Sequence, residues 1–168
     1  MWSFETHRAM NLLAARGALF VGQSVRWPGT AMFDSLQGIE METRIEFPVA
    51  EELQLGFCTG LALQGFLVVS IFPRMDFLMR AMDQLVNHLD KLAEMSRGQF
   101  NPKVIIRTRV GGKTPLDAGP QHTQDHTRAL RMMLTTVKVA RVSSEDEVMP
   151  TYRRALERPE STVVVEAV

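Results

Sequence analysis

The sequence predicts an α/β fold of three layers (α/β/α), in which a mostly parallel six-stranded sheet is covered by helices on both faces. Two observations support this prediction. Apolar runs of strand length alternate with longer segments of helical period along the 168 residues. Strands separated by helices need crossover connections, which make the strands parallel. The length suits one domain, which we expect to span residues 1–168.

Six segments have the length and composition of strands in a parallel sheet. The clearest is 66–72, a buried apolar run, and 103–110 is rich in β-branched residues. The remaining candidates are 18–22, 43–47, 137–142 and 162–168. Because such sheets bind ligands beyond the carboxyl ends of their strands, functional residues are expected in segments 22–23, 72–77 and 111–124.

The segments between these strands have helical period. The longest is 76–96, where apolar residues recur at spacings of three and four and predict a packed helix. A second is 48–64, with Pro48 in its first turn, where a missing backbone N–H does no harm. The other expected helices are 1–16, 126–135 and one that begins at Ser144.

The helix that begins at Ser144 carries two local signals. Glu147 follows Ser144 by three residues, which is the spacing of a capping box. Pro150 falls inside the predicted helix. It is expected to kink the helix or delay its start, because proline lacks an N–H donor and clashes with the preceding turn.

Composition excludes several classes of protein. The net charge is zero, whereas nucleic-acid-binding domains usually carry a basic excess, so no nucleic-acid partner is expected. No apolar run approaches the roughly 20 residues that span a membrane, and residues 1–16 lack the apolar core of a signal peptide. We therefore expect a cytoplasmic protein. The single cysteine, Cys58, excludes an intrachain disulfide and is interpreted as a small buried side chain.

Two short motifs suggest sites but fail on inspection. Residues 111–114 read Gly-Gly-Lys-Thr, yet a phosphate-binding loop needs a glycine at the position of Arg107. His122 and His126 are four residues apart, but the zinc hydrolase pattern needs a glutamate where Thr123 stands. We therefore predict no metal ligands in this chain, and the sequence contains neither a dinucleotide-binding nor a nucleophile-elbow motif.

One pattern survives. Glu51 is followed after four residues by Gly56 and an apolar residue, and then after two residues by Gly60 and another apolar residue. Separately, two glycines four apart allow close helix packing, and a glutamate in a first turn faces the helix dipole. The combination is more specific. It resembles a pattern shared by thiamine diphosphate enzymes.

The flanking residues extend this resemblance from about residue 6 to residue 168. The segments that carry it are 47–51, 64–66, 76–77, 81–87, 102–107 and 121–124. Their succession resembles the β-subunit of pyruvate dehydrogenase-type 2-oxoacid dehydrogenases. It is more distantly similar to the pyrimidine-binding central domain of transketolase. The resemblance implies an α/β fold for thiamine diphosphate binding and a substrate among 2-oxoacids or ketoses.

The resemblance also implies roles for four residues. Glu51 would bind the cofactor's aminopyrimidine and promote the tautomer that takes a proton from the thiazolium carbon; Glu52 lacks the motif's spacing to Gly56. Phe77 would pack on the aminopyrimidine ring, and His122 would face the substrate. Gln23 would lie near the cofactor, where these β-subunits usually carry a glutamate. Without the resemblance, Phe77 is a core residue and His122 a polar loop residue.

The resemblance implies a second chain as well. These enzymes hold the diphosphate through Mg²⁺ on a Gly-Asp-Gly motif, which this sequence lacks. We expect neither that diphosphate-binding domain nor the family's further C-terminal domain in this chain. We therefore expect a diphosphate-binding partner subunit that holds Mg²⁺, a homodimer or heterotetramer, and no activity of this chain alone. The family meets other subunits through the helices that here carry Gly56, Gly60, Met75, Met79 and Met82. The alternative is a non-catalytic regulatory or structural partner that keeps the dimerisation surface.

Overall fold

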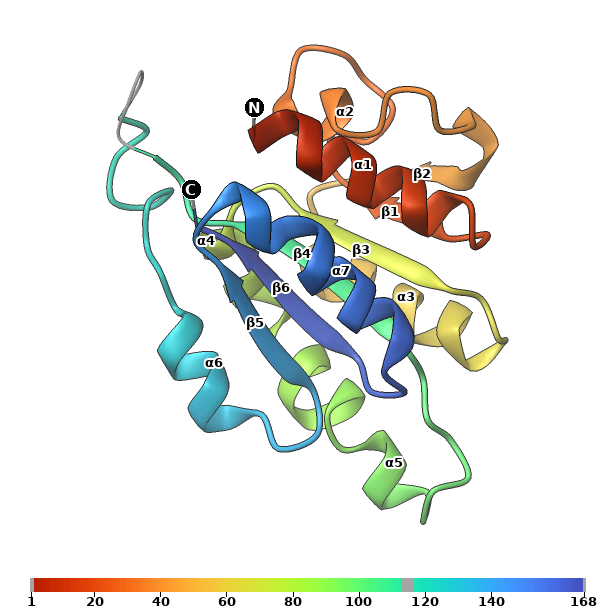
Figure 1. The fold of residues 1–168 in the computed structure, drawn as a ribbon. Coiled ribbons are helices and arrows are strands. Elements are labelled where there is room, and N and C mark those ends of the chain that lie inside the picture. Colours follow the sequence, from red (N-terminus) through yellow and green to blue (C-terminus); the bar gives the residue numbers. More distant parts are fainter. Residues whose placement is uncertain (1, 113–116, 168) are drawn as a thin grey trace.

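The computed structural model describes residues 2–112 and 117–167. Lys113 and Thr114 of the rejected phosphate-loop motif lie outside this range, as do part of the segment 111–124 and the last residue of the predicted strand 162–168. Six strands form one sheet in the order β2-β1-β3-β4-β6-β5, and every neighbouring pair is parallel (Figure 1). The strands are β1 (Leu19–Gly22), β2 (Arg44–Glu46), β3 (Val68–Phe72), β4 (Val104–Arg109), β5 (Lys138–Val142) and β6 (Thr162–Glu166). The predicted sheet is confirmed.

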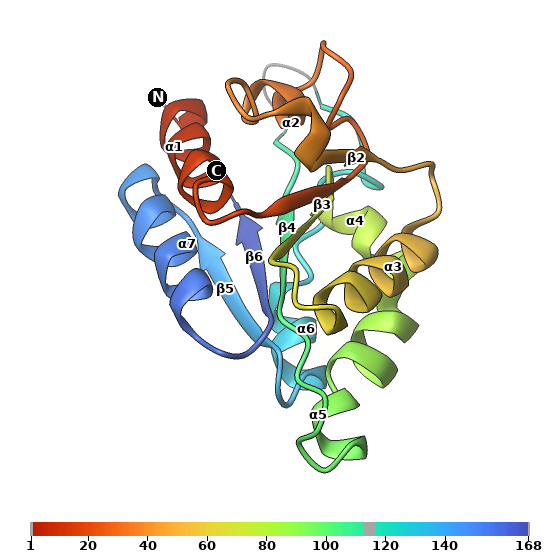
Figure 2. The ribbon, with the colours of Figure 1, turned by 90° about the vertical axis from the view of Figure 1, so that its right-hand side faces the viewer.

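Helices cover both faces of the sheet, as Figure 2 shows from the side. One face carries α1 (Trp2–Ala14), α2 (Ala31–Asp34) and α7 (Val148–Glu157). The other carries α3 (Glu51–Leu63), α4 (Met75–Leu78), α5 (Leu92–Met95) and α6 (Thr127–Met133). Each face of the sheet packs against its helices in a separate hydrophobic core. Side chains of β3 alternate between the two: Val69 and Ile71 lie in the core under α1 and α7, whereas Val68 and Phe72 lie in the core under α3 to α6.

The helix after β2 begins later than predicted. Residues 48–50 form a tight turn, in which the amide of Ala50 donates to the carbonyl of Pro48 at 2.7 Å. Ala50 is the N-cap and Glu51 is the first helical residue. The prediction that Pro48 occupies the first turn is therefore wrong. The later start places Glu51 at the helix terminus.

The predicted helix 76–96 is not one regular helix. After α4 the chain forms a 3₁₀ turn, η2 (Met79–Ala81), and then a π-helix, η3 (Gln84–Leu89), before α5. The apolar stripe is still buried at Leu78, Leu85 and Leu89. The sequence therefore predicts correctly which side chains are buried. It does not predict that the backbone changes from α-helical to 3₁₀ and π hydrogen bonding along the segment.

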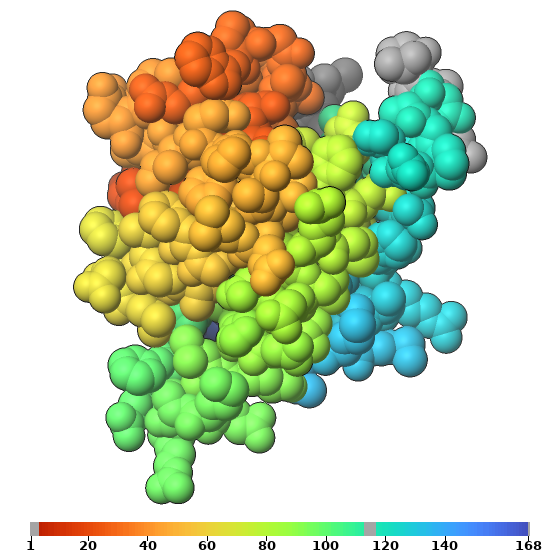
Figure 3. Space-filling model, turned by 180° about the vertical axis from the view of Figure 1, so that it is seen from behind, coloured from red at the N-terminus to blue at the C-terminus, as the bar shows by residue number. Residues whose placement is uncertain are grey.

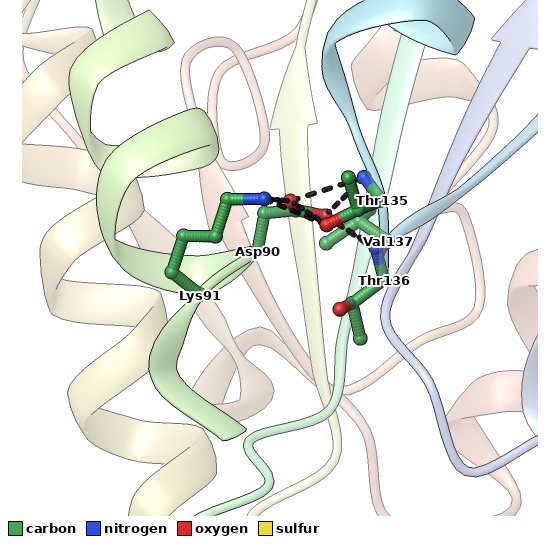
Figure 4. A network of polar contacts seen from close by, with 5 residues as sticks. All are labelled: Asp90, Lys91, Thr135, Thr136 and Val137. Atoms are coloured by element: carbon green, nitrogen blue, oxygen red, sulfur yellow. Dashed lines mark hydrogen bonds and ion pairs between the residues drawn. The ribbon is translucent and has the colours of Figure 1, made fainter. Parts of the chain in front are cut away.

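A buried carboxylate explains where the helix departs from regularity. Asp90 ends the wide turn with its amide bonded to the carbonyl of Leu85, five residues back. Its side chain accepts bonds from the amides of Thr135, Thr136 and Val137 at 2.8–3.1 Å and from Lys91 at 2.9 Å (Figure 4). These contacts fasten the helical segment to the turn that precedes β5. The wider π-turn, whose hydrogen bond spans five residues instead of four, places Asp90 where it makes these contacts.

The C-terminal helix confirms one of two local signals. A 3₁₀ turn, η4 (Glu145–Glu147), precedes α7, so Pro150 lies in the first turn of α7 and the helix starts late, as expected. The capping box is wrong, because the Ser144 side chain makes no cap hydrogen bond. The Glu147 carboxylate instead accepts the amide of Ser143 at 2.7 Å.

A buried ion pair joins β4 to β6. Arg107 donates two hydrogen bonds to the Glu166 carboxylate, at 2.9 and 3.2 Å, and a third to the hydroxyl of Ser35 at 2.7 Å. The Tyr152 hydroxyl donates to the same carboxylate at 2.7 Å. All four side chains are buried. The network therefore connects the sheet to α7 and to the segment after α2.

Cys58 is buried in the α3–α6 core, as predicted. Burial raises the pKa of its thiol to about 12, although a hydrogen bond with Ser70 acts in the opposite direction. A thiol with this pKa is protonated at neutral pH, so it is not a nucleophile. Within residues 2–112 and 117–167, no helix is both long and apolar enough to cross a membrane.

Candidate functional site

The carboxyl edge of the sheet gathers the predicted site residues. In a parallel sheet the strands end at the same edge, so the segments after β1, β2, β3 and β4 lie near one another. Gln23 follows β1, Glu51 begins the helix after β2, Phe77 lies in α4 after β3, and His122 lies in the loop after β4. The topology therefore brings all four to one side of the domain.

The end of β1 approaches β3 very closely. A Cβ atom on Gly22 would lie 2.3 Å from the carbonyl oxygen of Ile71, nearer than any real side chain tolerates. Glycine at this position lets β1 lie flat against β3 up to its last residue. This close pairing fixes the position of the next residue, Gln23, at the carboxyl edge of the sheet.

The loop after β1 is held by the edge strand β2. The Glu46 carboxylate accepts the backbone amides of Ser24, Val25 and Arg26 at 2.7–2.9 Å. Two residues earlier on the same strand, buried Arg44 donates to the carbonyl of Val25 in this loop at 3.3 Å and to the carbonyls of Leu36 and Ile39, which follow α2. One side chain binds amides and the other carbonyls, so β2 fixes the conformation of this irregular segment.

Glu51 is the buried acid of the site, with only 2 % of its surface exposed. Its Oε1 accepts a hydrogen bond from Gln23 Nε2 at 3.2 Å. Its Oε2 lies 3.1 Å from Arg80 Nε, close enough for an ion pair but without hydrogen-bond geometry. Arg80 itself is largely exposed, so the Glu51 carboxylate lies beneath a side chain that solvent can reach.

A cavity of about 510 Å³ opens beside Glu51. It is lined by the start of α3 and by Arg80 and Gln84 from the segment that follows α4. Figure 3 shows this face, where α3 in orange and yellow lies against the green segment. Gly56 on α3 permits the approach, because a Cβ there would meet the Gln84 side chain at 3.2 Å. The neighbouring Glu52 is exposed.

Phe77 and His122 form a second contact of the site. Their rings meet edge to face, with 5.4 Å between centroids and an angle of 85°. Both line a cavity of about 390 Å³, together with Arg74, Arg109 and residues of the loop after β1 such as Ser24. Phe77 and His122 are each half-buried. Phe77 is therefore not simply a core residue, and His122 is not simply a solvent-exposed loop residue.

The position of His122 depends on a second close approach. A Cβ on Gly111 would lie 1.9 Å from the carbonyl oxygen of His122 and 3.4 Å from Arg74 Cδ. Only glycine allows the end of β4 to contact the His122 backbone in this way. His122 Nδ1 is buried and has no hydrogen-bond partner.

The four predicted residues thus form two pairs. Gln23 contacts Glu51, and Phe77 contacts His122. The chain itself connects the pairs, because Gln23 contacts Glu51 while the next residue, Ser24, lines the Phe77–His122 cavity. Among these four described residues, no hydrogen bond, ion pair or ring contact joins one pair to the other.

Four polar residues of the site were missed from the sequence. Arg80 contacts Glu51, Glu46 holds the loop, and Arg74 and Arg109 line the second cavity. Arg74 falls inside segment 72–77, where the sequence predicts functional residues, so its place in that segment could have indicated it. The other three show no motif, because only the folded sheet and loop bring them to the site.

The residues expected to meet another subunit divide into two groups. Met75 is fully buried in the α3–α6 core, and Met79 and Met82 are partly buried against it, so the Met75 side chain contributes to this chain's own core. Gly60 is exposed, with nothing within 4 Å of where its Cβ would be. It shares α3 with exposed Leu53 and Phe57. The open apolar surface therefore belongs to α3.

Comparisons with known proteins agree with this architecture. The family described as "Transketolase, pyrimidine binding domain" matches residues 6–167. The β-subunit of 3-methyl-2-oxobutanoate dehydrogenase from Mycobacterium tuberculosis is 29 % identical over 119 residues, covering 71 % of this chain and 33 % of that protein. The pyruvate dehydrogenase E1 β-subunit from Acholeplasma laidlawii is 26 % identical over 129 residues, covering 74 % and 38 %.

A solved structure shows the same fold. It is described as "Split gene transketolase, inactive beta4 tetramer", and it matches with a TM-score of 0.76 at 14 % identity. The match covers 99 % of this chain and 51 % of that one. The aligned part spans only about a third of the curated relatives' length. The resemblance found in the sequence is confirmed: the chain belongs to the transketolase pyrimidine-binding domain family.

Proposed function

We propose that this chain binds the aminopyrimidine of thiamine diphosphate and supplies Glu51 as its activating carboxyl group. The observation that carries the proposal is the state of Glu51. It is almost fully buried, it is oriented by Gln23 through Oε1, and its Oε2 has no hydrogen-bond partner. This oxygen lies 3.1 Å from Arg80 Nε but accepts no hydrogen bond, and a ligand that donates one would satisfy it.

The residues fit the pyrimidine half of this cofactor. Glu51 Oε2 would meet a ring nitrogen, and the half-buried ring of Phe77 would pack against the aminopyrimidine plane. When bound, the cofactor supplies a carbon nucleophile. Glu51 would share a proton at Oε2 with the ring nitrogen, and Gln23 would keep that carboxyl group in place through its bond to Oε1. His122 would face the substrate from the neighbouring cavity.

We also propose that a second chain completes the site. The two relatives named above are β-subunits, and a β-subunit works beside other subunits. The sequence has no Gly-Asp-Gly motif for the diphosphate and Mg²⁺. Residues 1–168 would then form one pyrimidine-binding unit. The partner chain would hold Mg²⁺ and the diphosphate, and the assembled enzyme would act on 2-oxoacids or ketoses.

Cofactor binding by the assembled complex tests this proposal. The chain is co-expressed with a diphosphate-binding subunit, and thiamine diphosphate binding is measured by equilibrium dialysis in the presence of Mg²⁺. Phe77→Ala should weaken binding by about 2- to 10-fold, since one aromatic stacking contact is lost. Phe100→Ala, at an exposed site in the same chain, should leave binding unchanged. Equal binding by the wild-type and Phe77→Ala complexes would contradict the proposed site.

Two observations favour a second candidate, a regulatory or structural subunit without catalytic activity. The Arg80 guanidinium already lies against the Glu51 carboxylate, and Gln23 replaces the glutamate that these β-subunits usually carry. Such a subunit would assemble with its partner but give a complex that binds no cofactor. The same dialysis experiment separates the two candidates.

A further inference from the structure

The Arg80 side chain covers the one carboxylate oxygen of Glu51 that a ligand would need. That oxygen, Oε2, is buried and lies 3.1 Å from Arg80 Nε, without the geometry of a hydrogen bond. The other oxygen, Oε1, is already engaged by Gln23. Glu51 and Arg80 both line the cavity of about 510 Å³ beside α3. A ligand that enters this cavity to reach Oε2 therefore meets the Arg80 guanidinium.

The backbone of Arg80 is held in place, whereas its side chain extends into solvent. Arg80 lies in η2, between Leu78 and Ala81, whose side chains are fully buried in the α3–α6 core. The Arg80 side chain is 72 % exposed. Rotation about its side-chain bonds can therefore move the guanidinium from Glu51 into water while the segment itself stays in place.

The contact between Arg80 and Glu51 is close but weak. Ion pairs with an exposed partner typically change an equilibrium constant by no more than about 5-fold, because water competes for the charge and a long side chain loses freedom. Arg80 Nε also supplies no hydrogen bond to Oε2. A ligand that forms this bond gains an interaction that Arg80 does not make. Such a ligand can therefore displace Arg80, but with a reduced net affinity.

We propose that Arg80 is a displaceable gate on the Glu51 carboxyl group, which covers Oε2 in the empty chain and moves into solvent when the aminopyrimidine binds. The inference rests on the proposed function, because it names the aminopyrimidine as the displacing ligand. The fraction of chains with Arg80 turned away sets the apparent affinity, since a partly populated competent state weakens binding by that fraction. The contact is then a brake on cofactor binding and not the mark of a non-catalytic subunit.

Cofactor binding by the assembled complex tests the gate. Equilibrium dialysis with thiamine diphosphate and Mg²⁺ compares the wild type with Arg80→Met, which keeps an unbranched side chain but removes the charge. The variant should bind about 2- to 5-fold more tightly, because the competing ion pair is lost. Arg131→Met, at an exposed position on α6, should bind like the wild type. Equal or weaker binding by Arg80→Met overturns the gate.

The ion pair itself can be measured without any cofactor. Arg80→Met, Glu51→Gln and the double variant form a double-mutant cycle in the full chain, followed by urea unfolding. The two changes should be coupled by about 2- to 5-fold in the unfolding equilibrium constant, since each removes one partner of the same pair. Absence of coupling would show that Arg80 does not hold Glu51 in solution, and it overturns the gate.

The two measurements keep this inference apart from the proposed function. Cofactor binding that is equal in the wild-type and Arg80→Met complexes contradicts the gate alone and leaves the aminopyrimidine site standing. Binding by neither complex contradicts both proposals. Coupling in the cycle, together with tighter binding by Arg80→Met, supports both.

Discussion

The side-chain amide of Gln23 and the buried carboxylate of Glu51 are joined by a hydrogen bond of 3.2 Å between residues 28 positions apart. This contact connects the end of β1 to the first residue of α3. A glutamine here brings a hydrogen-bond donor and no charge. The pair therefore orients the Glu51 carboxyl without placing a second acid beside it.

Removing that donor should destabilise the chain. Gln23→Met keeps the side-chain volume but leaves Glu51 Oε1 without its bond, and hydrogen bonds to charged groups are worth about 1.5–3 kcal/mol. The free energy of unfolding, measured with urea, should fall by about that amount. Gln64→Met, at an exposed glutamine, is the matched control. Equal stability of the two variants would show that the Gln23–Glu51 contact is not maintained in solution.

Gly111 should not tolerate a side chain. Gly111→Ala places a Cβ 1.9 Å from the His122 carbonyl oxygen, so the backbone has to move. Overpacking of this kind costs about 1–3 kcal/mol, and the His122 ring should leave its contact with Phe77. Thermal unfolding and the NMR signals of both rings report the two effects. Gly60→Ala has open space and should be neutral or stabilising. Unchanged ring signals in Gly111→Ala would be inconsistent with this packing.

The exposed face of α3 is where a second subunit should pack. Leu53 is 63 % exposed there, whereas Met132 is 77 % exposed on α6. Leu53→Ala should leave the stability of the isolated chain within about 0.5 kcal/mol, as for most surface changes. It should weaken association of the chain in sedimentation velocity, and Met132→Ala should not. If both variants associate like the wild type, the α3 face is not the interface.

Asp90 should make stability depend on acid pH. Burial opposes ionisation of Asp90, but hydrogen bonds from Lys91 and from the amides of Val137, Thr135 and Thr136 prevail and lower its pKa to about 2. Because the folded value lies below the unfolded one, the contribution is complete above about pH 4 and is lost as the pH falls toward 2.

The Asp90→Asn variant tests this dependence. It should be less stable than the wild type at pH 6, because an amide replaces the carboxylate that accepts these bonds. The difference should shrink below pH 3, when the wild-type carboxylate gains a proton. Urea unfolding at both pH values measures it, with the exposed Asp34→Asn as control. A difference that stays constant with pH would show that the Asp90 charge does not contribute.

Much of the fold could be predicted because its signals are local. The inner strands β1, β3, β4 and β6 are buried on both faces, so they stand out as apolar runs, and the helices between strands dictate parallel order. The irregular stretch after α4 could not be predicted in the same way. Its π-turn accompanies contacts between Asp90 and residues about 45 positions later, which no local pattern encodes.

The candidate site divides in the same manner. Glu51 could be found because its spacing to Gly56 and Gly60 is a recognisable pattern on one helix. Arg80 and Arg109 could not, because they reach the site from other elements and follow no pattern. Met75 lies on a helix predicted to meet another subunit, but its own side chain packs in the core, since helical period alone does not reveal which face the sheet covers.

The central claim is that Glu51 activates the cofactor, and proton exchange at the thiazolium carbon tests it most directly. Exchange is followed by NMR in the complex assembled with the diphosphate-binding subunit. Glu51→Gln should slow exchange by about 10²- to 10⁴-fold, the usual effect of losing acid–base assistance. Glu52→Gln, at the exposed neighbour, should exchange like the wild type. Equal exchange rates in wild type and Glu51→Gln would contradict the catalytic role and favour a non-catalytic subunit.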